Sequence, residues 1–307
     1  MIRRFPAAVL FLSLSLVAAG CSKSASDTTA PSAETAETTV AASAESTTVG
    51  AVDNGATAET SVVAAAGAAA DIKLITPGKI TACSDIPYAP FEYYENGADG
   101  AVVGIGAELV TAIAADSGLT TDFIKTPFDG IFASLAAGNC DIISSSVSIT
   151  DERKKANDFS DPYFTIQQSI LVASADAATL TDTPALKGKK VGAQAATTGA
   201  DFAKAEGSKN GFTVTEFQGA DEMIAAIKAG QVDAVIQDSP INAYAATQSN
   251  GELIVSKLFP AAGEAYGFVI PKSNPGLRDA MNVSLKQLQD SGKYKEIVAK
   301  YLGAAAA

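Results

Sequence analysis

The side chains that could take part in chemistry are few, and histidine is absent from the 307 residues. Without histidine the chain has no His-based catalytic triad, no histidine general base and few means of binding zinc. Three cysteines remain, Cys21, Cys83 and Cys140, and their spacing fits no metal-binding motif. The sequence therefore predicts no metal site, no cofactor and no catalytic residue, and it leaves charged and hydroxyl groups as the candidates.

Arg153 and the segment Thr197-Thr198-Gly199 are the candidate anion-binding groups. Arg153 is one of two arginines that follow residue 20, and a guanidinium is a planar, two-pronged donor that fits a carboxylate. The threonines lie between a predicted strand and a predicted helix, and the first N–H groups of a helix attract anions because they lack partners inside it. Two simpler interpretations stay open: a surface arginine, and threonines that only cap the helix.

Asp238 is the candidate cation-binding group. It ends a predicted buried strand, where an acid needs a cation or hydrogen-bond donors to be tolerated. A purely structural aspartate is the alternative.

Short apolar runs that alternate with amphipathic segments from Asp71 onward predict the elements that position these residues. Apolar residues at three- and four-residue spacing predict helices, as in the segments 277–288 and 294–301. Strands that alternate with helices predict parallel α/β sheets. The predicted strands are Ile80–Ser84, Asp122–Lys125, Asp141–Ser145, Ser169–Ala173, Lys190–Ala193, Val214–Phe217, Val232–Ile236 and Tyr266–Pro271.

One internal similarity predicts two lobes of like design. Residues 135–146 align without gaps on residues 227–238, and both segments have the order helix end, Gly, Asp, apolar strand, polar residues. Gly138 and Gly230 suit the left-handed position that closes a helix. Ligands of open parallel sheets bind at the carboxyl ends of the strands. We therefore expect a site between the two segments' polar ends, Ser145-Ser146 and Gln237-Asp238.

The charge of the chain excludes one class of partner. Residues 71–307 hold 19 basic and 28 acidic residues, a net charge of −9. Binding to nucleic acid depends on neutralising phosphates with Lys and Arg, so an acidic body argues against it.

The first 70 residues differ in composition from the rest. Arg3 and Arg4, an apolar run to Val17 and small residues before Cys21 predict a signal peptide over residues 1–20. Cys21 in that place resembles a bacterial lipoprotein processing site, although Ala18 replaces the usual Leu; a secreted protein with an incidental Cys is the alternative. Residues 21–70 then predict a lipidated cysteine and a flexible, disordered tether, because an Ala/Ser/Thr/Glu-rich segment without aromatic residues cannot offset its ordering entropy.

Several motifs in order resemble the family 3 solute-binding proteins, the polar amino-acid receptors of ABC importers. Two departures from the family pattern are Ile105-Gly106, where Phe-Asp is usual, and Ala196, where Gly is common. The motifs are Ser84–Glu92, Val103–Leu109, Phe128–Ile131, Ser145–Arg153, Phe159–Tyr163 and the stretch from Tyr266 to Leu302.

The resemblance implies a fold and its boundaries. We expect an α/β, two-lobe periplasmic-binding-protein-like fold of type II, in which each lobe is a mostly parallel sheet flanked by helices. Residues 71–173 plus 266–307 would form the first lobe and residues 174–265 the second, joined by two crossover strands near Ala173–Ala175 and Gly263–Tyr266.

The resemblance also implies roles for the candidate residues. The ligand carboxylate would bind Arg153, Ser148, Thr197 and Thr198, and the ligand ammonium would bind Asp238 and Ser146. Tyr88 and Phe128 would form walls around the ligand side chain, although core packing is the alternative for both. Asp85, Gln194 and Gln237 are the polar candidates at the side-chain end. Because no Arg, Lys or His is available there for a second carboxylate, polar neutral or basic amino acids are favoured over Glu and Asp.

The implied function is extracytoplasmic capture of an L-amino acid by hinge closure and its delivery to an ABC importer permease. The protein would be monomeric and anchored to the membrane by its lipid. Two alternatives remain: an enzyme of the same fold, such as a prephenate or arogenate dehydratase-like protein, and a ligand sensor without transport.

Cys83 and Cys140 are expected to be free thiols. Their positions on two predicted neighbouring strands differ by about four residues, or about 13 Å, and a disulfide needs Cα atoms within about 7 Å.

Overall fold

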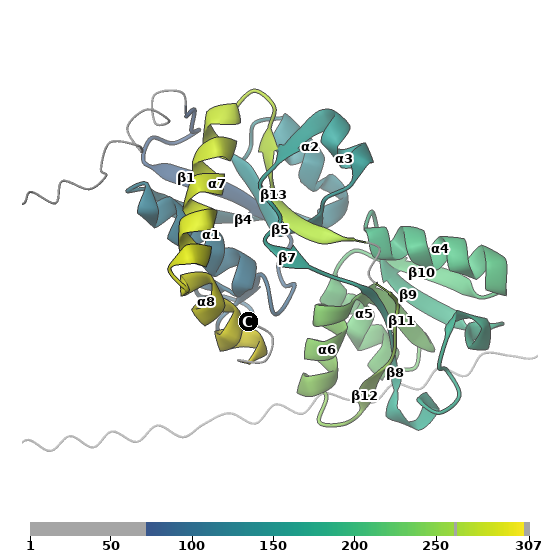
Figure 1. Ribbon diagram of the computed structural model, residues 1–307. Helices are drawn as coiled ribbons and strands as arrows, with labels where there is room; N and C mark the ends of the chain where they lie inside the picture. The colour runs from purple at the N-terminus through teal and green to yellow at the C-terminus, as the bar shows by residue number, and fades with distance from the viewer. Residues whose placement is uncertain (1–71, 261–262, 304–307) are drawn as a thin grey trace, which may run out of the picture. The chain divides into compact units, whose positions relative to one another are not determined.

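The computed structural model describes residues 72–260 and 263–303, which form two α/β lobes (Figure 1). The predicted signal peptide 1–20, Cys21 and the tether to residue 70 lie outside the described residues. Among the described residues, no helix combines the length and the apolar character needed to cross a membrane.

The first lobe is built on a mixed sheet in the order β4-β1-β5-β13-β6, with β7 also paired to β13. β4, β1 and β5 are parallel, and β13 returns antiparallel to β5, β6 and β7. The strands are β1 (Lys79–Ser84), β4 (Thr120–Lys125), β5 (Ile142–Ser148), β6 (Asn157–Phe159), β7 (Phe164–Thr165) and β13 (Ala265–Pro271); a separate hairpin pairs β2 (Tyr93–Tyr94) with β3 (Val102–Val103).

The second lobe has the sheet order β10-β9-β11-β8-β12. Its first three strands are parallel, and β8 is antiparallel to both β11 and β12. The strands are β8 (Gln168–Ala173), β9 (Lys190–Gln194), β10 (Thr213–Phe217), β11 (Ala234–Asp238) and β12 (Leu253–Leu258). All eight predicted strands are present, and β12 is an additional edge strand.

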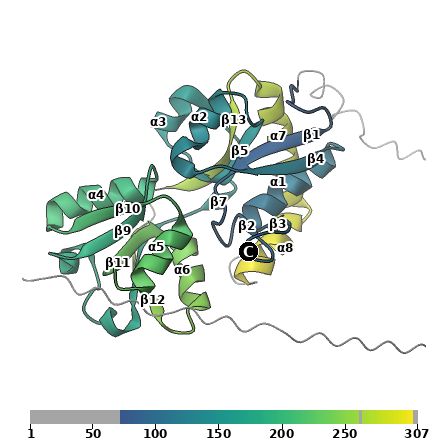
Figure 2. The same ribbon diagram turned by 180° about the vertical axis from the view of Figure 1, so that it is seen from behind.

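Helices cover both faces of each sheet, and Figure 2 gives the opposite view. The first lobe carries α1 (Ile105–Asp116), α2 (Ile131–Ala136), α3 (Asp151–Ala156), α7 (Pro275–Asp290) and α8 (Lys293–Leu302). The second carries α4 (Thr198–Asn210), α5 (Ala220–Lys228) and α6 (Ser239–Gln248). Short 3₁₀ helices span Phe128–Gly130, Ser174–Asp176 and Thr183–Leu186.

Alternating side chains of the strands explain why both faces are covered. On β1, Ile80 and Ala82 join the core under α1, α7 and α8, whereas Cys83 faces the core under α2. On β11, Ala234 and Ile236 pack in one core and Val235 in the other. Since successive side chains of a strand point to opposite faces, an apolar strand needs a helical layer on each side.

The two aligned segments of the sequence make equivalent contacts in the two lobes. Asp141 accepts hydrogen bonds from the backbone N–H of Thr81 at 2.7 Å, and Asp233 accepts from that of Lys190 at 2.8 Å. Each aspartate therefore ties the start of its own strand to the start of the neighbouring parallel strand. Gly138 and Gly230 both have the expected positive φ, at 74° and 67°.

The crossover between the lobes comes earlier than expected. Residues 168–173, assigned from the sequence to the first lobe, form β8 and pair with β11 and β12 in the second. The chain thus crosses at Ile166–Gln167, between β7 and β8. A buried strand has the same apolar sequence pattern in either sheet, so the sequence does not show which lobe the strand joins. Its pairing partners decide the lobe.

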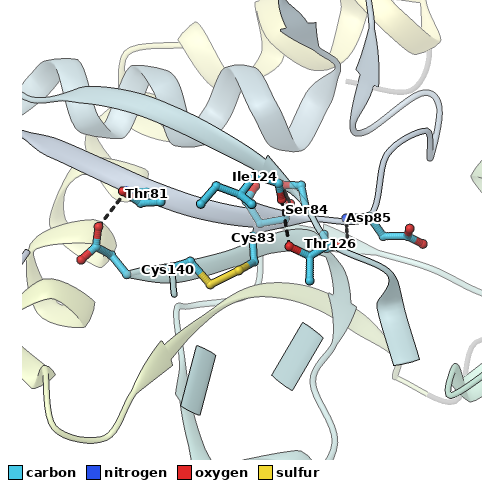
Figure 3. The surroundings of a disulfide bond; sticks show 10 residues. Thr81, Cys83, Ser84, Asp85, Ile124, Thr126 and Cys140 are labelled. Atoms are coloured by element: carbon cyan, nitrogen blue, oxygen red, sulfur yellow. Dashed lines mark hydrogen bonds between the residues drawn. A yellow bond between two sulfur atoms is a disulfide. The ribbon is translucent and has the colours of Figure 1, made fainter. Parts of the chain in front are cut away.

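The expectation of free thiols at Cys83 and Cys140 is wrong. The two residues form a disulfide with their Cα atoms 5.7 Å apart (Figure 3). In the parallel register Cys83 pairs with Ile143, three residues beyond Cys140. However, β5 begins only at Ile142, and the chain bends at Asp141, so Cys140 does not extend the strand in a straight line.

Replacing Cys83 and Cys140 together by alanine should lower the free energy of unfolding by about 4 kcal/mol, because the unfolded chain loses a long cross-linked loop. Urea unfolding of the variant and of the unreduced protein measures the difference. Alkylation of denatured, unreduced protein followed by mass mapping is the control. Labelling of either cysteine before reduction would show that the disulfide is absent.

Candidate ligand-binding site

A small cavity of about 10 Å³ lies where the carboxyl ends of the strands of both lobes meet. That volume is about one water molecule. Its lining includes most of the residues singled out from the sequence: Asp85, Tyr88, Phe128, Ser145, Ser146, Ser148, Arg153, Gln194, Thr197, Thr198 and Asp238.

Arg153 is held in α3 with its guanidinium directed across the cavity. Its Nη1 donates to the Ser148 carbonyl at 2.9 Å, and its Nη2 donates to the Ala196 carbonyl of the second lobe at 3.1 Å. Its guanidinium carbon lies 5.5 Å and 5.4 Å from the ring centroids of Phe128 and Phe132. The aromatic faces and carbonyls orient the planar group, so it is a fixed cation and not a free surface arginine.

The charge of Arg153 is not neutralised by a salt bridge within the described residues. Arg278 differs, because it pairs with Asp158 at 2.9 Å and with Asp279 at 2.7 Å. Burial lowers the pKa of Arg153, and the nearby Asp238 carboxylate opposes that shift. A half-buried cation without a paired anion favours an incoming carboxylate.

The start of α4 faces Arg153 from the second lobe. The Thr197 hydroxyl caps the helix by accepting from the Ala200 N–H at 3.1 Å. Ala196 has a φ of 63°, in the left-handed region that favours glycine. The next two residues, the N-cap Thr197 and the first helical residue Thr198, begin α4 and line the cavity.

Asp238 ends β11 and is bonded to three donors. Gln168 Nε2 donates to Oδ1 at 2.6 Å, and the hydroxyls of Tyr266 and Tyr88 donate to Oδ2 at 2.5 Å and 3.2 Å. Burial raises the pKa of Asp238, because these neutral donors do not fully replace water around the charge. The site thus holds a carboxylate that a cation would stabilise further.

Glu264 is a third acidic group beside the cavity, and it was not among the residues predicted to bind the ligand. It accepts from the Thr198 hydroxyl at 3.1 Å and from Gln168 Nε2 at 3.3 Å. The same amide nitrogen therefore bonds both Glu264 and Asp238, which brings two carboxylates close together. The signal that could have found Glu264 is its place between Gly263 and the last predicted strand, on the second crossover.

Asp85 follows β1 and also lines the cavity. Its carboxylate accepts from Gln194 Nε2 of the second lobe at 2.5 Å, and its N–H donates to Ser145 Oγ at 2.9 Å. Figure 3 shows Asp85 pointing away from β1, beyond the disulfide. Burial raises the pKa of Asp85 to about 6, and the Gln194 bond partly opposes the shift.

The predicted aromatic walls are both in place. Tyr88 and Phe128 line the cavity and are 8% and 6% exposed. Phe128 also packs against Ile131 and Leu135 in the core under α2. The wall and core interpretations of Phe128 are therefore not exclusive.

The two serines of β5 that were predicted to bind the ligand lie differently. Ser148 Oγ is 3.4 Å from Thr198 Oγ1 across the lobes, beside the Arg153 guanidinium. The Ser146 hydroxyl instead donates to the buried Glu92. Ser146 therefore lines the cavity with its hydroxyl already bonded to Glu92.

Gln237 does not line the cavity, in contrast to the expectation. Its Nε2 donates to Asn242 Oδ1 at 3.1 Å, inside the second lobe. Gln237 and Asp238 are neighbours on β11, so their side chains leave opposite faces of the strand. Ser145, which the sequence analysis placed at the strand end without a role, lines the cavity instead.

The lining has two carboxylates, Asp85 and Asp238, and one cation, Arg153. Groups that could hold a metal ion, three or more acidic, Cys or His side chains together, are not found in residues 72–260 and 263–303. The arrangement can hold one carboxylate and two cations.

The model of the bacterial extracellular solute-binding proteins, family 3, matches residues 80–304. The chain belongs to this family. The chain is 33% identical over 229 residues to the probable histidine-binding protein of Neisseria gonorrhoeae. The aligned region covers 73% of this chain and 84% of that protein.

Solved structures of family 3 type agree with the two-lobe fold of type II. The arginine-, lysine-, histidine-binding protein ArtJ of Geobacillus stearothermophilus is 34% identical, with a TM-score of 0.65 over 73% of this chain and 95% of that one. The ancestral amino-acid-binding protein AncCDT-1, a precursor of cyclohexadienyl dehydratase, is 33% identical, with a TM-score of 0.66 over 73% and 95%.

Substituting Asp85→Asn should stabilise the protein at pH 7.5 without added amino acid. The folded-state pKa of about 6 lies above the ordinary 3.8, so ionised Asp85 reduces stability above pH 6 by up to about 3 kcal/mol. That reduction disappears as the pH falls through 6 toward 4, where both states bind the proton.

Urea unfolding of both proteins at pH 7.5 and pH 4.5 measures the effect. The stability difference between Asp85→Asn and the wild type should shrink at the lower pH. A variant no more stable than the wild type at pH 7.5 would contradict the expected burial cost.

Proposed function

We propose that this protein captures a basic L-amino acid between its two lobes and delivers it to the permease of an ABC importer. The observation that carries the proposal is the charge of the cavity: one fixed guanidinium, Arg153, between two buried carboxylates, Asp85 and Asp238. A ligand with one carboxylate and two cations complements that lining.

The backbone groups of such a ligand fit one half of the cavity. Its carboxylate would bind Arg153, Ser148 and the start of α4 at Thr197 and Thr198. Its α-ammonium would bind Asp238, with the backbone of Ser146 beside it. Arg153 and Asp238 come from different lobes, so a bound amino acid would bridge them.

The ligand side chain would occupy the other half, between Tyr88 and Phe128, with its end at Asp85 and Gln194. A guanidinium, ammonium or imidazolium would restore the ionised form of Asp85, whose pKa burial raises. The names of the relatives, which bind histidine, arginine or lysine, support the same class. A polar neutral amino acid such as glutamine is the second candidate, because Asp85 and Gln194 can also bond an amide.

Ligand entry requires the lobes to separate. The cavity is too small for an amino acid, and hydrogen bonds cross from one lobe to the other. They include Asp85 to Gln194, Tyr88 to Asp238, Arg153 to the Ala196 carbonyl and Ser148 to Thr198. Capture is then a hinge motion in which the ligand's groups take over these partners. The two crossovers, at Ile166–Gln167 and before Ala265, would be the hinge.

Location and transport follow from the same proposal. Cys21 would carry the lipid that anchors a monomeric protein outside the cytoplasmic membrane, and residues 21–70 would tether it. Labelling with a palmitate analogue, lost in Cys21→Ala, tests the anchor. Uptake measurements in a deletion strain separate transport from sensing.

The proposal treats the protein as a binding protein and not as an enzyme. A dehydratase of prephenate-like acids would need a second cation for the second carboxylate, and Arg153 is the one cation of the described lining. Turnover of such acids by the purified protein would overturn this part.

Calorimetry with L-arginine, L-lysine, L-histidine, L-glutamine and L-glutamate is the test of ligand class. Basic amino acids should bind most tightly and glutamate should not bind, because Asp85 would repel a second carboxylate. Glutamate or aspartate as the tightest ligand would refute the proposal.

The pH dependence sharpens this test. Below pH 6 Asp85 must lose a proton to bind a cationic side chain, so arginine affinity relative to glutamine should fall by up to about tenfold per pH unit. Asp238 meets the α-ammonium of both ligands, so its titration cancels in the ratio. In Asp85→Asn the ratio should not change with pH.

Arg153→Lys should weaken amino-acid binding by about 100-fold or more, since a point charge cannot replace two directed donors to a desolvated carboxylate. Arg278→Lys is the matched control, because Arg278 already has Asp158 and Asp279 as partners. Calorimetry on both variants decides. Equal affinities of the two variants would show that Arg153 does not bind the ligand.

A further inference from the structure

Glu92 is a buried carboxyl group that the proposed binding mode does not use. It is 0% exposed and forms no salt bridge with any described Lys or Arg. Burial raises its pKa well above the ordinary value, while the hydroxyl and the backbone N–H of Ser146 lower it. A group so costly to bury needs a physical reason.

The reason lies in the strand that Glu92 contacts. β5 and β13 pair at Val147 with Gly267, and the next pair is Ile143 with Val269. β5 therefore advances four residues while β13 advances two, which is a bulge over Ser144–Ser146. Ser146 inside it has a φ of 47°, a left-handed conformation that a non-glycine residue keeps only when its surroundings hold it.

The Glu92 carboxyl group holds this bulge. Ser146 Oγ lies 3.2 Å from Oε1 and 3.0 Å from Oε2, and the serine is 5% exposed. The neighbours of Ser146 are bonded to the end of β1. Ser145 Oγ accepts from the Asp85 N–H, and the Ser144 carbonyl accepts from the Ser84 hydroxyl. A shift of the bulge would move Ser145, Ser146 and Asp85 together.

The backbone of Glu92 holds a second cavity residue. The Tyr88 N–H donates to the Glu92 carbonyl at 2.6 Å, and the Glu92 N–H donates to the Tyr88 carbonyl at 3.1 Å. Tyr88 forms a wall of the cavity and donates its hydroxyl to Asp238. One residue thus connects the aromatic wall with the bulge.

A glycine in α1, Gly106, leaves space for this carboxyl group. A Cβ atom on Gly106 would lie 2.1 Å from Glu92 Oε1 and 3.5 Å from the Tyr163 hydroxyl. Any side chain at residue 106 would therefore force the Glu92 carboxyl group to move. The departure from the family pattern at Ile105-Gly106 leaves room for the Glu92 position seen here.

We propose that Glu92 is a positioning residue of the ligand site: its carboxyl group fixes the left-handed bulge at Ser146 and its backbone fixes Tyr88, without contact to the ligand. The inference rests on the proposed amino-acid binding. It explains why a carboxyl group is kept in a place where an apolar side chain would be easier to bury.

A double-mutant cycle on the full chain tests the contact. Glu92→Ala and Ser146→Ala are measured singly and together by calorimetry with L-arginine, at a temperature well below every melting transition. Each single variant should bind about tenfold more weakly, because Ser146 without its anchor leaves the left-handed conformation. The double variant should be no weaker than the worse single variant, because both remove the same contact.

Two further variants separate positioning from general stability. Glu92→Gln keeps the shape and a carbonyl oxygen, so its affinity should stay within about threefold of the wild type. Asp141→Ala removes another buried carboxylate, which directly precedes the amino end of β5 and does not line the cavity, and should lower the melting temperature without changing affinity.

The outcomes are distinct. Unchanged affinity in folded Glu92→Ala, or additive losses in the double variant, would overturn the inference while leaving the proposed function intact. If Glu92→Ala does not fold, unchanged affinity in Ser146→Ala overturns it and a loss in that variant supports it. A wild-type protein that binds none of the tested amino acids would overturn the proposed function and this inference together.

Discussion

Charged side chains beside the strand ends that form no salt bridge among the described residues are the constraint on which this structure depends. Asp238 is surrounded by neutral donors, and Arg153 is held by carbonyls and aromatic rings. Such charges are expensive unless a counter-charge arrives. The fold places Arg153 and Asp238 in different lobes, and the proposed amino-acid ligand would supply a counter-charge to each.

The surrounding structure stabilises the sheets that carry these charges. Aspartates at matching positions, Asp141 and Asp233, tie each central strand to its neighbour. Cys83 directly precedes Ser84, the last residue of β1, and Asp85 follows. The disulfide to Cys140 therefore cross-links the carboxyl end of β1 to the segment before β5. Rigid elements under a site reduce the ordering that binding would otherwise require.

Left-handed backbone at described non-glycine residues is concentrated at the cavity, with Asn250 as the exception. Of the three described non-glycine residues with positive φ, Ser146 and Ala196 both contribute to the site. Each turns a backbone segment toward the cavity: the bulge of β5 in one lobe, and the start of α4 in the other. Left-handed residues kept at such places are consistent with pre-organisation of a binding site.

The sequence by itself determined much of this protein. Its short apolar runs predicted eight strands, and all eight are present. The aligned Gly-x-x-Asp segments predicted two lobes whose strand ends face one another. Ten of the eleven residues predicted to contact the ligand line the cavity. These features depend on local patterns and on a motif order that one chain carries openly.

Only the tertiary structure decided the rest. β8 belongs to the second lobe because of its pairing partners, and Cys140 reaches Cys83 because the chain bends before β5. Gln237 turns into its own lobe, and Glu264 and Glu92 meet residues far away in sequence. The physical reason is common to all: which side chains meet across strands and lobes depends on register, bends and bulges, and local sequence patterns do not specify these.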